Sequence, residues 1–108
     1  MKIRKRKPLS QEKIQDIAWS KAIKERDNGC VIGVDCKGYL NAHHIVPREH
    51  RKWRWELDNG LTLCVKHHKF CIKLSAHRNA PSFLAWLHRH RPYVLALAYE
   101  RSEEVWKE

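Results

Sequence analysis

The residues of this chain that can do chemistry are its cysteines and histidines, and most of them gather in two segments. The chain holds 4 cysteines and 8 histidines among 108 residues. The first segment, Cys30 to Pro47, reads CVIGVDCKGYLNAHHIVP, and the second, Asn59 to Cys71, reads NGLTLCVKHHKFC. Thiolates and imidazoles are the usual protein ligands of zinc and related metals. Metal binding is therefore the first chemistry that the sequence predicts.

One group of these residues has the spacing of a structural zinc site. Cys64 and His67 are three positions apart where we expect a strand to pass into a helix, so both can face one tetrahedral ion. Cys30 and Cys36 complete a set of four ligands. Cys71 follows His67 by one helical turn on the same face, so it is an alternative fourth ligand. The other interpretation is that these cysteines are buried free thiols that pack as small hydrophobic side chains.

A second group consists of the adjacent residues His43 and His44, together with His68. Neighbouring residues of a strand point to opposite faces, so His43 and His44 cannot both bind one ion in regular backbone. One of them can hold a catalytic metal with His68, while the other, with a pKa near its ordinary ~6.5, can take a proton from water. Phosphodiester hydrolysis needs such a base for the water and a cation at the phosphoryl oxygens.

A hairpin and a helix are needed to bring these side chains together. The segments Tyr39 to Ile45 and Leu61 to Leu63 predict two short strands that pair as a hairpin. The connection from Pro47 to Asp58 is long for a small domain, and loops of this length usually carry function. A helix is expected from Cys64 to about Leu74.

Further helices are expected on both sides of this core. Ser10 is an N-cap for a helix over residues 11–27, which Asn28 and Gly29 end in the left-handed conformation. Asn79 caps a second helix and Pro92 opens a third, so that two helices fill residues 79–106. Residues 1–9 are basic and present no apolar face, which predicts a flexible arm.

The size and the charge of the chain limit its partners. A length of 108 residues allows one domain, which we place at residues 10–108 with the metal-binding core at 30–74. The 22 Lys and Arg against 12 Asp and Glu give a formal net charge of +10, so we expect a polyanion as partner. The candidate phosphate contacts, which are otherwise solvated charges, are Arg48, Arg51 and Arg54 on the long loop and Lys5 and Arg6 on the arm. Trp53 and Trp55 either stack on bases or belong to the core.

The sequence also bears on the compartment. No apolar stretch of the kind found in a secretory signal follows the basic N-terminus, and the longest apolar run, Tyr93 to Tyr99, falls short of the ~20 residues of a membrane-spanning helix. We therefore expect a soluble, cytoplasmic protein. In that compartment cysteines stay reduced and bind metals rather than form disulfides.

The two segments resemble the HNH endonucleases, a family with a ββα-metal fold. The resemblance covers residues 30–91 and is carried by Ala42 to Pro47 (AHHIVP), Trp55 to Cys64 (WELDNGLTLC) and the pair His67 and His68. The segment Ser75 to Leu87 (SAHRNAPSFLAWL) is similar to small phage and prophage members, which implies a bacterial or phage-infected cell. The resemblance implies an α+β fold with a ββα-metal core, a β-hairpin and zinc-binding knuckles, flanked by helices.

The resemblance also implies roles for single residues. His43 and His68 would be ligands of a catalytic divalent ion, which could be Mg²⁺, Mn²⁺, Ni²⁺ or Zn²⁺. His44 would be the general base, and Asn59 would order the long loop. The cysteine knuckles of the family correspond to Cys30 and Cys64.

Together these observations predict a metal-dependent DNA endonuclease, and the resemblance implies that it leaves 5′-phosphate and 3′-hydroxyl ends. The alternative is a catalytically silent, zinc-stabilised module that binds DNA in phage recombination or packaging. A zinc-stabilised domain that binds only proteins is disfavoured by the net charge of +10. A monomer and a homodimer are both compatible with the sequence.

Overall fold

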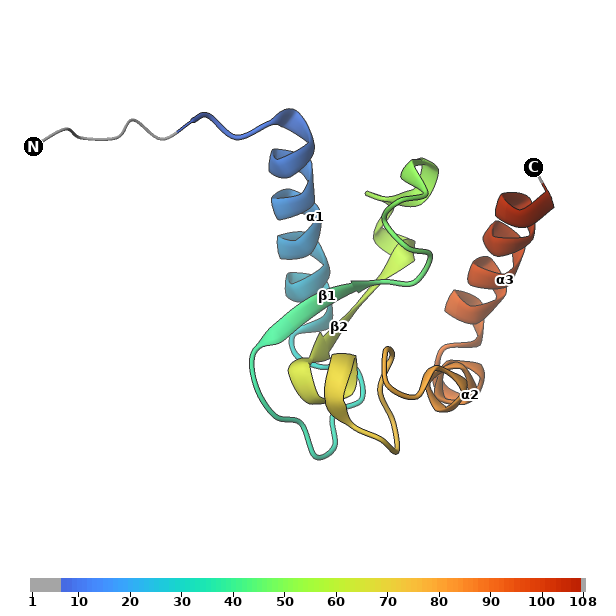
Figure 1. Cartoon of the computed structure of the whole chain (residues 1–108). Coiled ribbons are helices and arrows are strands. Elements are labelled where there is room, and N and C mark those ends of the chain that lie inside the picture. Colours follow the sequence, from blue (N-terminus) through green and yellow to red (C-terminus); the bar gives the residue numbers. More distant parts are fainter. Residues whose placement is uncertain (1–6, 108) are drawn as a thin grey trace, which may run out of the picture.

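The computed structural model describes residues 7–107 and has an α+β fold in which a two-stranded hairpin lies among helices (Figure 1). The α+β class predicted from the sequence is confirmed. Lys5 and Arg6, two of the predicted DNA contacts, lie outside the described residues. In chain order the elements are α1 (Gln11–Asp27), β1 (Leu40–His44), η1 (Arg51–Trp53), η2 (Leu57–Asn59), β2 (Gly60–Cys64), η3 (Lys66–Phe70), α2 (Ala80–His90) and α3 (Pro92–Lys107).

The helix ends follow the capping residues that the sequence predicts. The Ser10 hydroxyl accepts a hydrogen bond of 3.1 Å from the backbone N–H of Lys13, and α1 ends at Asn28 with φ of 52°. The Asn79 side chain likewise accepts from the N–H of Ser82 at 3.2 Å and starts α2. Within residues 7–107, no helix is long and apolar enough to cross a membrane.

The hairpin has two faces, and neighbouring residues of each strand divide between them. β1 and β2 are antiparallel, with His43 opposite Leu61 and His44 opposite Gly60. Because side chains alternate along a strand, one face carries His43, Leu61 and Leu63 and the other carries His44. The prediction that His43 and His44 point in opposite directions is confirmed. The ring of His43 contacts Phe83 of α2, whereas the ring of His44 contacts Trp19 of α1.

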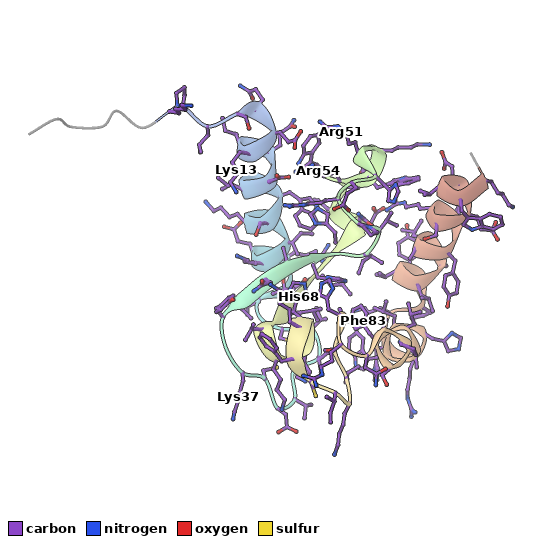
Figure 2. The ribbon with its side chains drawn as sticks, viewed as in Figure 1. Lys13, Lys37, Arg51, Arg54, His68 and Phe83 are labelled. Atoms are coloured by element: carbon purple, nitrogen blue, oxygen red, sulfur yellow. The ribbon has the colours of Figure 1, made fainter. Side chains whose placement is uncertain are left out.

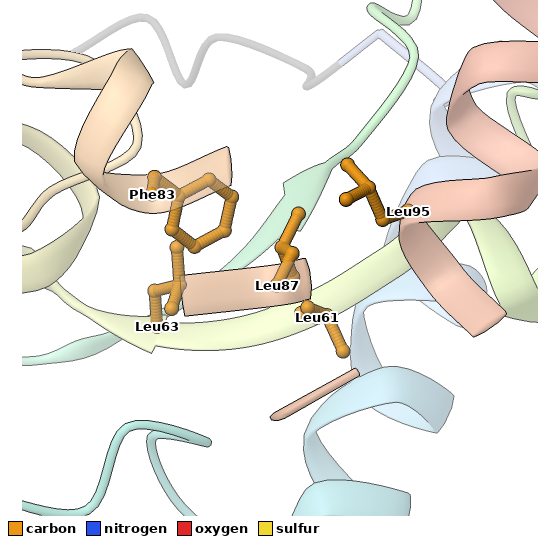
Figure 3. Packing of buried hydrophobic residues seen from close by; sticks show 5 residues of the cluster. All are labelled: Leu61, Leu63, Phe83, Leu87 and Leu95. Carbon is orange, nitrogen blue, oxygen red and sulfur yellow. The ribbon is translucent and has the colours of Figure 1, made fainter. Parts of the chain in front are cut away.

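The first face packs against α2 and α3 and forms the main hydrophobic core (Figure 3). On this face, the β2 residues Leu61 and Leu63 are buried leucines. They meet apolar side chains of α2 that are spaced four residues apart. The members of this core are Leu61, Leu63, Phe83, Leu87 and Leu95. Burial of five large apolar side chains at ~1.5–3 kcal/mol each holds α2 and α3 on the hairpin.

The second face packs against α1. Trp19 and Ile23 are buried there, and Gly60 of β2 leaves the room that Trp19 occupies, because a Cβ atom at Gly60 would lie 2.3 Å from Trp19 Cζ2. The hydroxyl of Thr62, on the same face, donates to the backbone carbonyl of Ile23 at 3.3 Å. A close approach of α1 to the hairpin therefore requires glycine at position 60.

The helix predicted from Cys64 to about Leu74 is wrong in length. Its observed counterpart, η3, is a short π-helix that ends at Phe70, and the backbone N–H of Cys71 closes it by donating to the carbonyl of Lys66 at 2.8 Å. Such single π turns are frequent at functional sites.

The chain after η3 turns back and lies against it. The backbone N–H groups of Ala76 and His77 donate to the carbonyls of His67 and His68, at 2.9 and 3.0 Å. These carbonyls accept from the returning chain instead of from a further helical turn, which explains why the helix stops. The same two hydrogen bonds place His77 next to His68.

Candidate active site

Four predicted zinc ligands lie together where β2 passes into η3. The ligand atoms of Cys30, Cys36, Cys64 and His67 are all within 4.8 Å of one another. Cys64 Sγ lies 3.2 Å from His67 Nδ1, and the sulfurs of Cys30 and Cys36 each lie 3.8 Å from the same nitrogen. Sulfur and nitrogen ligands of a tetrahedral zinc ion are about 3.5 Å apart, given Zn–S and Zn–N bonds of ~2.3 and ~2.0 Å. The four residues fit that ion.

The electrostatics of these thiols also suit a cation. Desolvation, together with the neighbouring thiols of Cys30 and Cys64, raises the pKa of the Cys36 thiol to about 11. Several thiolates cannot share so small a volume unless a positive charge lies between them. The cluster, which we call the cysteine cluster (Cys30, Cys36, Cys64 and His67), could therefore hold a structural zinc ion.

Cys71, the alternative fourth ligand, is not part of this cluster. The backbone N–H groups of Leu74 and Lys73 face its thiol and lower its pKa. The reason for its exclusion is the short η3, because the chain is already extended at Cys71 and the one-turn spacing from His67 no longer applies.

Three histidines form a second cluster on the other side of η3. His43 of β1, His68 of η3 and His77 of the returning chain bring their ligand nitrogens within 4.8 Å of one another. His68 Nε2 lies 3.1 Å from His43 Nδ1 and 3.0 Å from His77 Nε2. Figure 2 shows His68 near the middle of the molecule, beside the hairpin. We call this set the histidine cluster.

The histidine cluster fits a divalent transition metal. The single lone pair of His68 Nε2 faces two other ring nitrogens, and a cation between them would satisfy all three rings at once. Metal–nitrogen bonds of ~2.0–2.1 Å separate neighbouring ligand nitrogens by about 3 Å, which agrees with the observed spacing. Burial, followed by the nearby histidines, lowers the pKa of His43 to about 3 and that of His68 to about 4. Protons therefore do not compete for these nitrogens at neutral pH.

Sequence reasoning missed His77. It lies nine positions after His68, beyond the end of a helix that was expected to continue, and no regular spacing joins the two residues. The available signal was its place in the segment Ser75 to Leu87, which the family resemblance includes and which follows the active site. Only the turn after η3 brings it to the cluster.

His44 lies on the opposite face of β1, and its ring is held in one orientation. The ring stacks on Trp19 with a centroid distance of 3.9 Å and an interplanar angle of 9°. His44 Nε2 lies 2.9 Å from the backbone carbonyl oxygen of Arg54, which can only accept, so Nε2 must carry the proton. Burial lowers the pKa of His44, which keeps the ring neutral at pH 7. Its Nδ1 atom then offers a lone pair that has no partner within residues 7–107.

Asn59 is 1% exposed and binds the backbone of the long loop. Its Oδ1 accepts from the N–H of Val46 at 2.9 Å, while its Nδ2 donates to the carbonyls of Val46 and Trp53 at 3.0 and 3.2 Å. Trp53 directly precedes Arg54, whose carbonyl orients His44. The amide of Asn59 therefore fixes the loop segment on which the orientation of His44 depends.

The structure changes the interpretation of two loop arginines. Arg54 is buried, and its guanidinium forms a two-point ion pair with Asp16 of α1 at 2.9 and 2.7 Å. Arg51 pairs with Glu12 at 2.5 Å. These pairs tie the loop to α1, and both arginines lie at the loop in Figure 2. The contacts of Arg51 and Arg54 with phosphates stay predictions. Neither the sequence position nor the charge of a loop arginine reveals such a partner.

Arg48 is exposed and, unlike Arg51 and Arg54, makes no ion pair within residues 7–107. It lines a cleft of about 640 Å³ whose walls also include the histidine cluster and Phe83. The two tryptophans also differ: Trp53 is 8% exposed and belongs to the interior, whereas the indole N–H of Trp55 donates to Asp16 at 2.9 Å.

The fold and these sites place the chain in the class of small α+β proteins with metal-binding sites. Its cysteine cluster and its histidine cluster could each hold a metal ion. Residues 26–70 match the model of a family described as HNH endonuclease. The resemblance predicted from the sequence is thereby confirmed, and the family indicates a nuclease-type function. Neither the curated proteins nor the solved structures contain a significant match. His77 lies outside the matched segment.

Proposed function

We propose that the protein is a metal-dependent DNA endonuclease in which β1, β2 and η3 form a ββα-metal core. The observation that carries this proposal is the division between two adjacent histidines. His43 joins the histidine cluster, while His44, on the other face of the strand, keeps a free lone pair on Nδ1. The match of residues 26–70 to the HNH endonucleases supports the same reaction class.

His43, His68 and His77 would hold the catalytic ion through the three nitrogens that already face one another. Three neutral imidazoles suit Zn²⁺ or Ni²⁺ better than Mg²⁺. A divalent ion bound there supplies a Lewis acid for the phosphoryl oxygens and for the leaving oxygen of the cleaved bond.

His44 would act as the general base. With its proton fixed on Nε2 by the Arg54 carbonyl, Nδ1 can accept a proton from the attacking water. Stacking on Trp19 restrains the ring, so that the lone pair keeps one direction. Asn59 acts as a positioning residue, since it holds the carbonyl of Trp53 and thus the loop beside Arg54.

The remaining residues have supporting roles. Arg48, exposed at the edge of the cleft, would contact a phosphate of the substrate. The cysteine cluster would hold a structural zinc ion. It would take no part in the reaction, because its four ligands occupy all four coordination positions of a tetrahedral ion. We assign residues 10–108 to one nuclease domain, which cleaves DNA to 5′-phosphate and 3′-hydroxyl ends.

Incubation of supercoiled plasmid with the protein and one divalent ion at a time tests this function. Nicked or linear plasmid is expected with Mn²⁺, Ni²⁺ or Zn²⁺ and none without added ion. DNA ligase should reseal the nicks, because the proposed reaction leaves 5′-phosphate and 3′-hydroxyl ends. Tight DNA binding without cleavage under every ion would contradict the proposal and favour a silent DNA-binding module.

A further inference from the structure

A groove between α1 and β1 lies outside the histidine cluster, and the lysines that line it have no role in the chemistry described above. Its volume is about 970 Å³. Four basic side chains line it, Lys13, Lys21 and Lys24 of α1 and Arg48 of the loop. Lys13 is seen on α1 in Figure 2. Sequence analysis placed the DNA contacts on the loop and the arm, and did not consider this helix.

The three lysines lie on one stripe of α1. Positions 13, 21 and 24 differ by eight and three residues, which brings them to the same side of a helix with 3.6 residues per turn. The neighbouring side of α1 is occupied, because Trp19 and Ile23 pack on the hairpin. Lys13 and Lys21 are exposed and Lys24 is half-buried, so the lysine stripe lies outside the side of α1 that packs on the hairpin.

The acidic residues of the groove do not cancel this charge. Asp16 is held by the guanidinium of Arg54 and by the Trp55 indole. Glu25 pairs only with Lys21, at 4.0 Å, and both side chains are about 70% exposed (69% and 75%), so this ion pair contributes little. Lys13 and Lys24 have no ion pair within residues 7–107. The groove thus presents several cations that lack a partner in the protein.

The groove is continuous with the proposed catalytic cleft. Ala42, His44 and Arg48 line both cavities. A polyanion that lies along α1 would therefore reach His44 and Arg48 at the end of β1. From Lys13 to Lys24 the helix rises about 16 Å, which equals roughly five nucleotide steps of one DNA strand.

We infer that the groove between α1 and β1 binds the phosphate backbone of DNA on one side of the cleaved bond. This inference rests on the proposed function for the position of that bond, but the binding itself does not require cleavage. The interaction is with phosphates and carries no sequence preference, because lysine side chains present point charges and not a pattern for base edges.

The test is a triple variant, Lys13→Gln, Lys21→Gln and Lys24→Gln, and a control of equal charge, Lys73→Gln, Arg89→Gln and Lys107→Gln. The control residues lie far from α1 in the sequence and line neither cavity. Binding to a fluorescent DNA duplex is measured at several salt concentrations without added divalent ion. For the α1 variant, log affinity against log salt should lose about 2–3 in slope, and affinity at low salt should fall roughly tenfold or more. The control should keep the slope and the affinity of the parent.

Equal effects of the two variants would show that only net charge matters and would overturn the inference. An unchanged slope in the α1 variant would do the same. If the triple variant folds poorly, the single change Lys21→Gln should still lower the slope by about 0.9. In cleavage, the α1 variant should have a raised KM and an unchanged kcat. A parent that needs α1 for binding yet never cuts DNA would support this inference and refute the proposed function.

Discussion

The cysteine cluster and the histidine cluster each take one ligand from η3, and these two ligands are adjacent in the sequence. The clusters nevertheless differ in the number and the type of their ligand atoms. His67 points into a set of four ligands with three sulfurs, and His68 points into a set of three nitrogens. Four ligands close a tetrahedral ion, while three leave a position open. The histidine cluster lines a cleft of about 640 Å³. The comparison indicates that η3 contributes one ligand to a site suited to stabilise the fold and one ligand to a site suited to catalysis.

The difference has a consequence for mutation. Loss of a ligand on the cysteine side should damage the fold, because it would remove the proposed zinc ion, which would join the segment at Cys30 to β2 and η3. Loss of a ligand on the histidine side should damage activity and leave the fold, because the core of Leu61, Leu63 and α2 does not depend on it. The predictions below test this contrast.

The largest effect is expected for Cys64→Ser. Zinc bound by such clusters contributes on the order of 10 kcal/mol to folding, which is comparable to the whole stability of a typical domain. The variant should be unfolded or insoluble at 25 °C and should lose the tightly held zinc ion, as measured by circular dichroism and by metal analysis. Cys71→Ser is the matched control and should fold with its zinc. Normal melting of Cys64→Ser would remove the structural role of the cluster.

His77→Ala should show the opposite behaviour. The variant should melt like the parent and retain the zinc ion, but bind Ni²⁺ at the histidine cluster at least tenfold more weakly, since even losses of supporting residues cost 10–100-fold in affinity. Calorimetric titration of the zinc-loaded protein with Ni²⁺ measures this, and a higher Ni²⁺ concentration should restore part of the cleavage rate. The exposed residue His88 supplies the control, His88→Ala. Parent-like Ni²⁺ binding by His77→Ala would exclude His77 as a ligand.

Asn59→Ala should lower both the stability of the fold and the rate of cleavage moderately. It removes three buried hydrogen bonds to the loop and leaves backbone groups without partners, at a cost of about 2–3 kcal/mol in the free energy of unfolding. Cleavage should slow while the content of both metals stays normal. Asn59→Asp, which keeps only the acceptor side of the amide, should also lose activity. A variant as fast as the parent would separate Asn59 from the site.

The smallest effect is expected for Asp16→Asn. The Arg54 guanidinium, with the Trp55 indole, lowers the pKa of Asp16 to about 2, although desolvation opposes this. A lowered pKa contributes stability above the unfolded value of ~3.9, and this stability is lost only as the pH falls towards 2. The variant should therefore be less stable by about 1 kcal/mol, and by the same amount at pH 5.5 and pH 8. Urea unfolding of both proteins at the two pH values measures it. A difference that changes between these pH values would contradict the pKa assignment.

The local features of the fold and of the site could be predicted from the sequence because they depend on neighbours in the chain. Ser10 and Asn79 cap helices through residues three positions ahead, and the opposite directions of His43 and His44 follow from the pleat of any strand. The proximity of Cys64 and His67 likewise follows from their spacing. The antiparallel hairpin follows from two short segments with strand-like residue patterns.

The features that sequence reasoning missed depend on long-range contacts. His77 reaches His68 only because the returning chain binds the carbonyls of η3. Arg54 forms an ion pair with Asp16, which lies 38 positions earlier. The exposure of the lysine stripe of α1 depends on the packing of Trp19, because this packing decides which side of the helix is covered. The contacts of His77 and Arg54 leave no periodic signal in the sequence.

The central claim is that His44 provides the base while its neighbour His43 binds the ion, and one comparison tests it directly. Plasmid cleavage by the parent, His43→Ala and His44→Ala is measured over a wide range of Mn²⁺ concentrations, after DNA binding has been shown to be equal. Loss of a general base should slow His44→Ala by ~10²–10⁴ at every concentration, whereas high Mn²⁺ should restore part of the rate of His43→Ala. Cleavage by His44→Ala at the parent rate, or its rescue by Mn²⁺, would contradict the claim.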